Sequence, residues 1–285
     1  MLYREVVPDR RLRPFVKCLW MLDHDYANSF HDHEQLWADA HTELIFSTGE
    51  RYFQRIRSHI VWAPANLVVG PYQRDLQLYS RGRTSFVAAR FWPWGFHAFS
   101  KIPMLDLKNT VSSCHQALGP AMELLGAELA AIERLDARIA PLEQALLNAL
   151  DTVEAPELDS RPIAKEILAA HGVIRTGELA RKHRIHPRRM ERVFLEEIGV
   201  SAKVFARIVR FNHAKRAIEQ KPDIDLLWLA HECGYADQSH FTRNFREMFG
   251  ITPSGFKSKI RELLREFEQQ RPDVVFVQDS AEPSE

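Results

Sequence analysis

The segment "GYADQSHFTRNFREMFGITPSGF", residues 234–256, places a histidine, two arginines and a row of aromatic side chains within a short stretch. Such residues could form an acid/base site, a metal site or a surface that recognises another molecule. The sequence contains no Ser-His-Asp pattern, no Gly-rich phosphate loop and no paired-carboxylate motif, so no catalytic residue is expected. His240 lies among the hydrogen-bond donors of the segment and is assigned no catalytic role.

The spacing of the aromatic residues predicts a helix that carries these side chains. Phe241, Phe245 and Phe249 recur at every fourth residue and form one apolar stripe. Asp237 is a favourable N-cap for this helix, and Gly250 is a favourable end. The helix would therefore bury its aromatic face and expose hydrogen-bond donors on the opposite face.

This helix belongs to the second copy of an internal repeat. Residues 190–205, "MERVFLEEIGVSAKVF", align with residues 241–256, "FTRNFREMFGITPSGF", at an offset of 51. Each copy follows a shorter amphipathic helix and a tight turn, which predicts helix–turn–helix twice. Residues 201–220 form a long helix that joins the two units.

Residues 160–262 resemble the double helix-turn-helix domain of the AraC/XylS family of bacterial transcription regulators. The segment "LAHECGYADQSHFTRNFREMFGITPSGFK" carries this resemblance most specifically, and "LARKHRIHPRRMERVFLEEIGVSAKVFARIVR" fits in register. The resemblance implies a DNA-binding regulator, with double-stranded DNA as partner and RNA polymerase as a further expected partner. Activation of transcription is expected, and repression is the alternative that the sequence leaves open. No cofactor is implied.

By position in the family, the second helix of each unit would enter a major groove. Arg can donate to guanine O6 and N7, Gln can bond adenine N6 and N7, and Glu could accept from cytosine N4. Contacts to phosphates are expected from Arg189, Thr176, Arg175, Lys203, Arg207 and Lys257. Arg189 is the one of these that could contact a base instead. His186 stands at the first unit's turn, where a better cap would be expected. The expected base contacts come from Arg188, Glu191 and Arg192 in the first unit and from Gln238, Ser239, Thr242 and Arg243 in the second.

Charge is distributed unevenly although the formal net charge is zero. Residues 160–265 hold 21 Lys and Arg against 12 Asp and Glu, whereas residues 1–159 hold 16 against 20. A basic segment of this length favours a polyanionic partner. The chain contains no apolar run of about 18 residues and no leader pattern, so we expect a cytoplasmic protein without a membrane partner.

Short apolar or alternating runs occupy the chain up to about Phe99, and helical patterns rich in Ala and Leu follow from about Met104. The fold class predicted is α+β: an N-terminal antiparallel β barrel or sandwich, cupin-like in layout, with trailing helices and a C-terminal all-α double helix-turn-helix. The expected division is a sensory and dimerisation domain at 1–152, a linker at 153–162, the DNA-binding domain at 163–262 and an acidic tail at 263–285.

Apolar residues recur at helical steps through residues 116–150, which predicts either a homodimer interface or helices that simply cover the barrel. In a rigid pair of units the two recognition helices would lie about 34 Å apart, one turn of DNA. A dimer would then cover two such half-sites.

The front part has two candidate ligand sites. His31, His33 and His41 could hold a metal, lie exposed in a loop or take part in effector binding. His31 and His33 would supply two ligands from one side of a strand, but no third ligand is evident further along the sequence. Five of the six tryptophans lie before residue 95, where they could form a core or line a pocket for a small-molecule effector. The expected effector contacts are Trp37, Asp39, Glu43, Arg74, Arg90 and Trp92.

Two other functions stay open beside a ligand-responsive regulator. One is a metal-dependent cupin enzyme with a DNA-binding appendage, and the other is an architectural DNA-binding protein without an effector. Cys18, Cys114 and Cys233 are too few and too far apart for a disulfide framework, so we expect buried or inert thiols, with redox sensing as the alternative.

Overall fold

The computed structural model describes residues 2–26, 33–56, 59–73, 76–152 and 160–270. Its front part contains two antiparallel sheets, and the register of paired residues alternates their side chains between the two faces. In spatial order, the larger sheet consists of β1 (Leu2–Val6), β2 (Val16–Asp25), β9 (Arg83–Phe91), β4 (Glu43–Ser47), β7 (Asn66–Val69) and β10 (Val111–Ser113). The smaller sheet consists of β3 (His33–Leu36), β8 (Leu76–Tyr79), β5 (Phe53–Ile56) and β6 (His59–Trp62).

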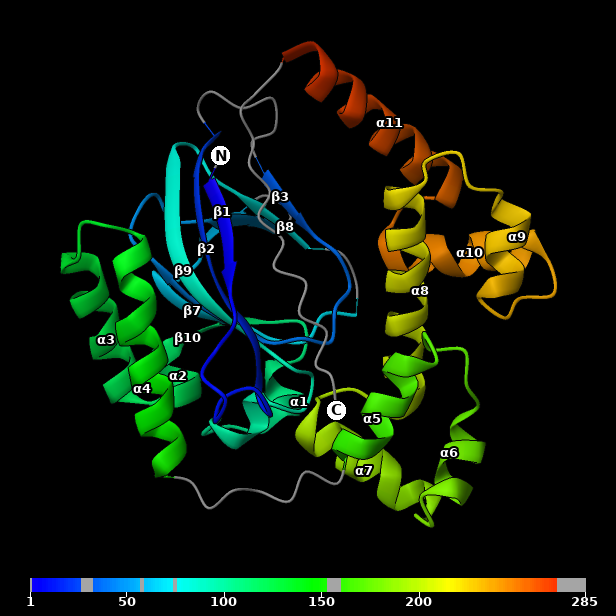
Figure 1. Ribbon diagram of the computed structural model, residues 1–285, viewed down its shortest axis with the longest axis horizontal. Coiled ribbons are helices and arrows are strands. Elements are labelled where there is room, and N and C mark those ends of the chain that lie inside the picture. The colour runs from blue at the N-terminus through cyan, green and yellow to red at the C-terminus, as the bar shows by residue number, and fades with distance from the viewer. Residues whose placement is uncertain (1, 27–32, 57–58, 74–75, 153–159, 271–285) are drawn as a thin grey trace.

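The two faces of the larger sheet are buried in different ways. One face packs toward the smaller sheet, where Ile45, Phe86 and Ala88 join a core rich in tyrosine. The other face, with Leu44 and Val87, is covered by helices. Figure 1 shows α3 and α4 on this side of the sheet and the C-terminal helices on the opposite side of the molecule. The covering elements are η2 (Phe96–Ala98), α1 (Met104–Leu107), α2 (Cys114–Leu118), α3 (Pro120–Ala131), η3 (Asp136–Arg138) and α4 (Ile139–Asp151).

The apolar stripe of α3 and α4 lies against the chain's own sheet. Leu125, Leu129, Leu142 and Leu146 are at most 6 % exposed and belong to the core under the sheet. This burial favours the alternative in which both helices cover the barrel. Leu124 points outward instead and is 67 % exposed.

The C-terminal part is helical throughout its described length, which confirms the α+β class. Two short–long helix pairs flank the long helix α8, as the repeat predicts (Figure 1). Within the described residues, no helix combines the length and the apolarity that a bilayer crossing requires. The elements are α5 (Ser160–Ala169), α6 (Thr176–Lys182), α7 (Pro187–Glu197), α8 (Ala202–Gln220), α9 (Leu226–Glu232), α10 (Gln238–Phe249) and α11 (Pro253–Gln270).

The expected linker and tail fall largely outside the described residues. Of the linker at 153–162, the structure describes only 160–162, which begin α5, and of the tail at 263–285 only 263–270, which end α11. The domain boundaries therefore stay a prediction.

The front and helical parts share a core. Ala38, Ala40 and Trp94 are at most 2 % exposed and lie in the same hydrophobic cluster as the helical part. The helices α1 and η2 also contact α7. The C-terminal helices are thus held against the front part through several separate contacts.

Candidate nucleic-acid interface

The second unit consists of α9, a turn that contains Gly234, and α10. Asp225 caps α9 by accepting from the backbone N–H groups of Leu227 and Trp228 at 2.7 and 3.0 Å. Gly234 has a φ of 74°, a left-handed conformation in which glycine carries no steric penalty. The chain can therefore reverse tightly between the two helices.

The ends and the buried face of α10 agree with the sequence. Asp237 accepts from the backbone N–H of His240 at 2.7 Å, and Gly250 ends the helix at a φ of 69°. Phe241, Phe245 and Phe249 are buried against Phe211 of α8, with ring centroids 5.9–6.3 Å apart. The predicted cap, stop and stripe are confirmed. The opposite face of α10 consequently points to solvent.

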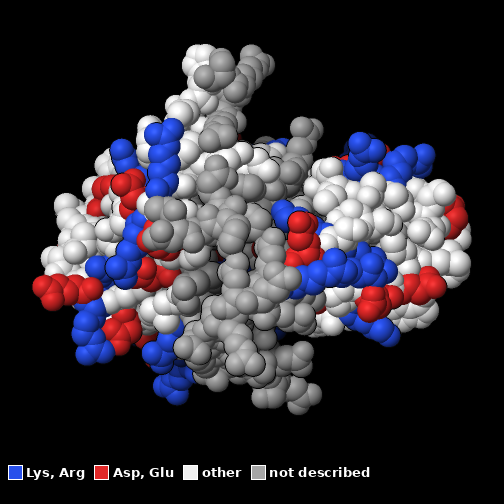
Figure 2. Space-filling model, turned by 90° about the horizontal axis from the view of Figure 1, so that it is seen from above, with Lys and Arg blue, Asp and Glu red and all other residues white. Residues whose placement is uncertain are grey.

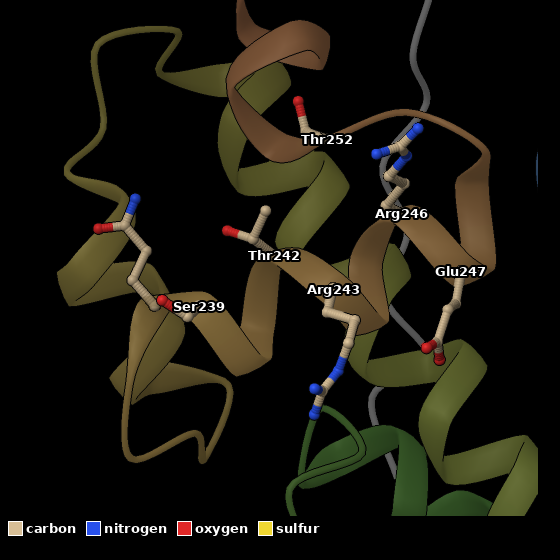
Figure 3. A pocket seen from close by; sticks show the side chains of 7 residues that line it. Ser239, Thr242, Arg243, Arg246, Glu247 and Thr252 are labelled. Carbon is tan, nitrogen blue, oxygen red and sulfur yellow. The ribbon is translucent and has the colours of Figure 1, made fainter.

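The expected base-contacting residues of the second unit meet on this outer face. They line one open hollow of about 690 Å³, and Arg243 extends from the helix beside Thr242 (Figure 3). Gln238, Ser239 and Arg243 are exposed and Thr242 is half-buried. Arginine, amide and hydroxyl groups thus converge on one concave surface. The lining residues are Gln238, Ser239, Thr242, Arg243, Arg246, Glu247 and Thr252.

The first unit has the same construction, with a different cap. His186 is the N-cap of α7, and its Nδ1 accepts from the backbone N–H of Arg188 at 3.3 Å. His186 therefore caps α7 with its imidazole, although a residue type that is more common at N-caps was expected at this position. Met190 and Phe194 are buried. The outer face of α7 carries four exposed residues from the predicted set: Arg188, Arg189, Glu191 and Arg192.

The residues expected at phosphates lie at helix starts or on outer faces, with one exception. Thr176 opens α6 directly after its N-cap Arg175, and Lys203 and Arg207 are exposed on the first turns of α8. Lys257 is half-buried, and its Nζ donates to the carbonyl of Ile224 at 2.6 Å. A phosphate contact by Lys257 would have to use its other N–H groups.

Charged groups are mixed on the surface. Figure 2 shows groups of Lys and Arg side chains on the lobe that Figure 1 identifies as helical, with Asp and Glu side chains beside them. Arg192, for example, lies 3.8 Å from Glu196, a pair of exposed side chains with a small energetic contribution. The excess of positive charge in this part is therefore distributed rather than confined to one patch on the face shown.

Three of the expected effector contacts gather in the front part. Arg90 donates to Oε1 of Glu43 from Nε at 2.9 Å and from Nη2 at 2.6 Å. The guanidinium also lies over the ring of Trp20, 5.6 Å from its centroid. Asp39 pairs with Nδ1 of His41 at 2.6 Å. Burial opposes the charge on Asp39, but His41 and Arg90 outweigh it and hold the pKa of that carboxyl well below its usual range.

Several buried polar atoms of the front part have no hydrogen-bond partner among the described residues. Among the described residues, five buried atoms have no hydrogen-bond partner: Trp20 Nε1, His41 Nε2, Thr42 Oγ1, Glu43 Oε2 and Ser47 Oγ. Buried polar atoms are normally satisfied by protein, water or ligand. Trp20, Thr42 and Ser47 were missed by sequence reasoning because their types alone do not distinguish them from core residues.

Of the other expected effector contacts, Trp92 lies beside His41, with ring centroids 6.2 Å apart, and stacks on Trp94 with centroids 5.7 Å apart. Trp37 lies against the helical part rather than in the front core. Arg74 lies outside the described residues.

The histidine cluster cannot be assembled from the described side chains. His31 lies outside the described residues, His33 is described only as backbone of β3, and His41 is paired with Asp39. In the part of the chain that the structure describes, no group of three or more His, Cys, Asp or Glu could hold a metal ion. Cys18, Cys114 and Cys233 are buried and free, and burial raises the pKa of each thiol to about 12.

Two family models match separate parts of the chain. Residues 179–259 match the model of a family described as a helix-turn-helix domain, and residues 4–113 match a domain of unknown function, DUF6597. The HTH-type transcriptional regulator Rv1931c of Mycobacterium tuberculosis is 27 % identical over 110 residues, 39 % of this chain and 42 % of that protein. The HTH-type transcriptional activator RhaS of Pectobacterium carotovorum is 27 % identical over 81 residues, 28 % of this chain and 29 % of that protein.

A remote likeness extends over more of the chain. ToxT from Vibrio cholerae, a solved structure, has 11 % identical residues and a TM-score of 0.47 over 84 % of this chain and 98 % of that one. The chain spans less than half the length of the curated relatives that it matches. The helix-turn-helix family model covers most of the two helix-turn-helix units, which agrees with the resemblance of residues 160–262 to the AraC/XylS family.

Proposed function

We propose that this protein is a sequence-specific DNA-binding transcription regulator, controlled by a small molecule bound in its front part. The observation that carries the proposal is the outer face of α10, where Gln238, Ser239, Thr242 and Arg243 line one exposed hollow. A helix that buries its aromatic back and exposes such groups near its N-terminus is suited to a major groove.

Each exposed group would have a defined partner on DNA. Arg243 and Arg192 would donate to guanine O6 and N7, and Gln238 would bond adenine N6 and N7. Arg188 would act as a second guanine donor in the first unit, and Glu191 would accept from cytosine. Lys203, Arg207 and the start of α6 would hold phosphates and so fix the register of the unit on the duplex.

The matched relatives support this function. Their names describe transcriptional regulators and activators. We assign the protein no catalytic role. Activation, a cytoplasmic location and contact with RNA polymerase are proposed on the same basis.

The effector site is proposed at the ion pairs of the front part. Asp39, Glu43 and Arg90 are each half-buried, and the buried atoms Glu43 Oε2 and His41 Nε2 have no partner among the described residues. A ligand that donates to the carboxylate oxygen and bonds the imidazole nitrogen would satisfy both atoms. A polar compound with neighbouring hydrogen-bonding groups fits this arrangement.

We also propose that the regulator acts as a homodimer, because two linked binding events on one duplex raise the apparent affinity. The stripe of α3 and α4 is occupied by the chain's own sheet, so the interface would use outward residues such as Leu124.

A substitution pair tests DNA recognition. Genomic fragments that the purified protein retains would first define its target. Arg243→Ala is then expected to lose roughly 1–3 kcal/mol of specific binding and to relax the preference at one base pair. Lys203→Ala should weaken binding to all sequences and lower the salt dependence. Equal losses on all sequences for both variants would contradict the assignment of Arg243.

A further inference from the structure

Trp37 belongs to the front part by sequence but contacts the core of the helical part. Its ring meets Phe249 and Phe256 edge to face, with centroids 5.5 and 5.4 Å apart and interplanar angles of 85° and 87°. Both phenylalanines are at most 2 % exposed. The Nζ of Lys259 lies over the tryptophan ring, 5.9 Å from its centroid. Such contacts are favourable in this distance range, so Trp37 completes a core to which it is not adjacent in sequence.

The residues that follow Trp37 fix it to both parts. We call residues 37–40 the strap. The carbonyl of Ala38 accepts from Nδ2 of Asn212, on α8, at 3.0 Å. On the other side, Asp39 exchanges two backbone hydrogen bonds with Tyr72 at 2.7 and 2.9 Å. Because the strap is bonded to α8 and to the front part, Trp37 has a defined position relative to both.

Trp37 meets α10 at the end opposite its expected base contacts. Phe249 is the last residue of this 12-residue helix, and Gln238 is the first. A helix of that length is about 18 Å long, so a tilt of about 3° at one end displaces the other by about 1 Å. Hydrogen bonds to base edges require donor–acceptor distances of about 2.7–3.2 Å. A displacement of this size is therefore enough to break them.

We propose that Trp37 is a positioning residue for the second recognition helix: it fixes the far end of α10 and thereby sets the base discrimination of the second unit. This inference rests on the proposed DNA-binding function. The front part meets the first unit through α1 and η2, against α7, whereas the aromatic contacts of Trp37 are to Phe249 of α10 and Phe256 of α11. The contribution of Trp37 is therefore expected at the base pairs that α10 contacts.

The test measures relative affinities of the full-length protein for every single-base variant of a selected site. Arg243→Ala and Arg192→Ala first identify which base pairs belong to each unit. Trp37→Ala is expected to reduce discrimination at the second unit's base pairs by roughly 2- to 30-fold, the range for residues that act without touching the ligand. Discrimination at the first unit's base pairs and the salt dependence should stay within about twofold of wild type.

Three further variants separate positioning from general destabilisation. Trp37→Phe retains an aromatic edge and should restore most of the discrimination, whereas Trp37→Leu fills space without a ring and should not. Trp62→Ala removes a 45 % exposed tryptophan from β6 and serves as the matched control. If circular dichroism shows that Trp37→Ala does not fold, the base discrimination of Trp37→Leu is compared with that of Trp37→Phe to test the inference.

Two outcomes would overturn the inference. One is unchanged discrimination in Trp37→Ala and Trp37→Leu, and the other is an equal loss at the base pairs of both units. Failure of the proposed function would look different, because Arg243→Ala would then change no base preference and no second-unit base pairs could be defined.

Discussion

Ser160, at the start of α5, donates two hydrogen bonds to the carboxylate of Glu197, near the end of α7. Its backbone N–H and its hydroxyl reach the same Oε2 at 3.0 and 2.6 Å. Glu197 is only 8 % exposed, and in the 51-residue repeat its place is taken by the buried Met248. The first unit thus buries a carboxylate where the second buries a thioether, and Ser160 compensates for the difference.

Removal of this carboxylate should destabilise the helical part. We expect Glu197→Ala to lower the free energy of unfolding by about 1–3 kcal/mol, because the N–H of Ser160 would be left buried without a partner. Glu197→Gln keeps an acceptor and should lose less. Urea unfolding followed by circular dichroism measures both values, and an unchanged midpoint in Glu197→Ala would contradict the structural role of the pair.

The glycines that end the two recognition helices should respond differently to alanine. Gly199 and Gly250 have φ values of 82° and 69°, so either substitution introduces strain of about 1–2 kcal/mol. A Cβ on Gly199 would in addition lie 2.6 Å from the carbonyl oxygen of Met104 in the front part. Gly199→Ala should therefore lower the thermal midpoint more than Gly250→Ala. The reverse order would argue against this contact between the two parts.

The three cysteines should be inert in the folded protein. Their thiols are buried, and a pKa of about 12 leaves almost no thiolate at pH 8. Mass spectrometry after brief exposure to iodoacetamide should find them unmodified, and all three should react in urea. Rapid modification of one thiol under native conditions would instead favour redox sensing.

Stability should fall as the pH drops below about 7. His213, on α8, stacks on His171 with ring centroids 4.1 Å apart. Burial, then His171 and Arg216, lower the pKa of His213 in the folded chain. The unfolded chain therefore takes up this proton first, near pH 6.5, and unfolding is favoured below that value.

His213→Gln tests this pH dependence through thermal midpoints between pH 7.5 and 5.5. The substitution should reduce the loss of stability on acidification, whereas His231→Gln, at an exposed position of α9, should leave it unchanged. If the thermal midpoint of His213→Gln fell with pH as steeply as that of the wild type, other titrating groups would determine the loss of stability.

Local features of the fold could be predicted from the sequence, whereas contacts between distant segments could not. The cap at Asp237, the aromatic stripe of α10 and the second helix-turn-helix follow from spacing within about 20 residues. The pairing of Glu43 with Arg90 depends on strand order, which periodicity does not determine. Trp37 shows the same limit for the site, because its aromatic type suggested a ligand pocket and the fold uses it to support α10. The base-contacting set on α7 and α10 stays a prediction until DNA is bound.

Selection of bound sequences from a random duplex library by the full-length protein tests the central claim most directly. The claim is that α7 and α10 of one chain enter two successive major grooves. The enriched sequences should then contain two blocks of preferred base pairs whose centres lie about 10–10.5 base pairs apart. Arg192→Ala should weaken one block and Arg243→Ala the other. Enrichment of a single block, or of no sequence above background, would contradict the account.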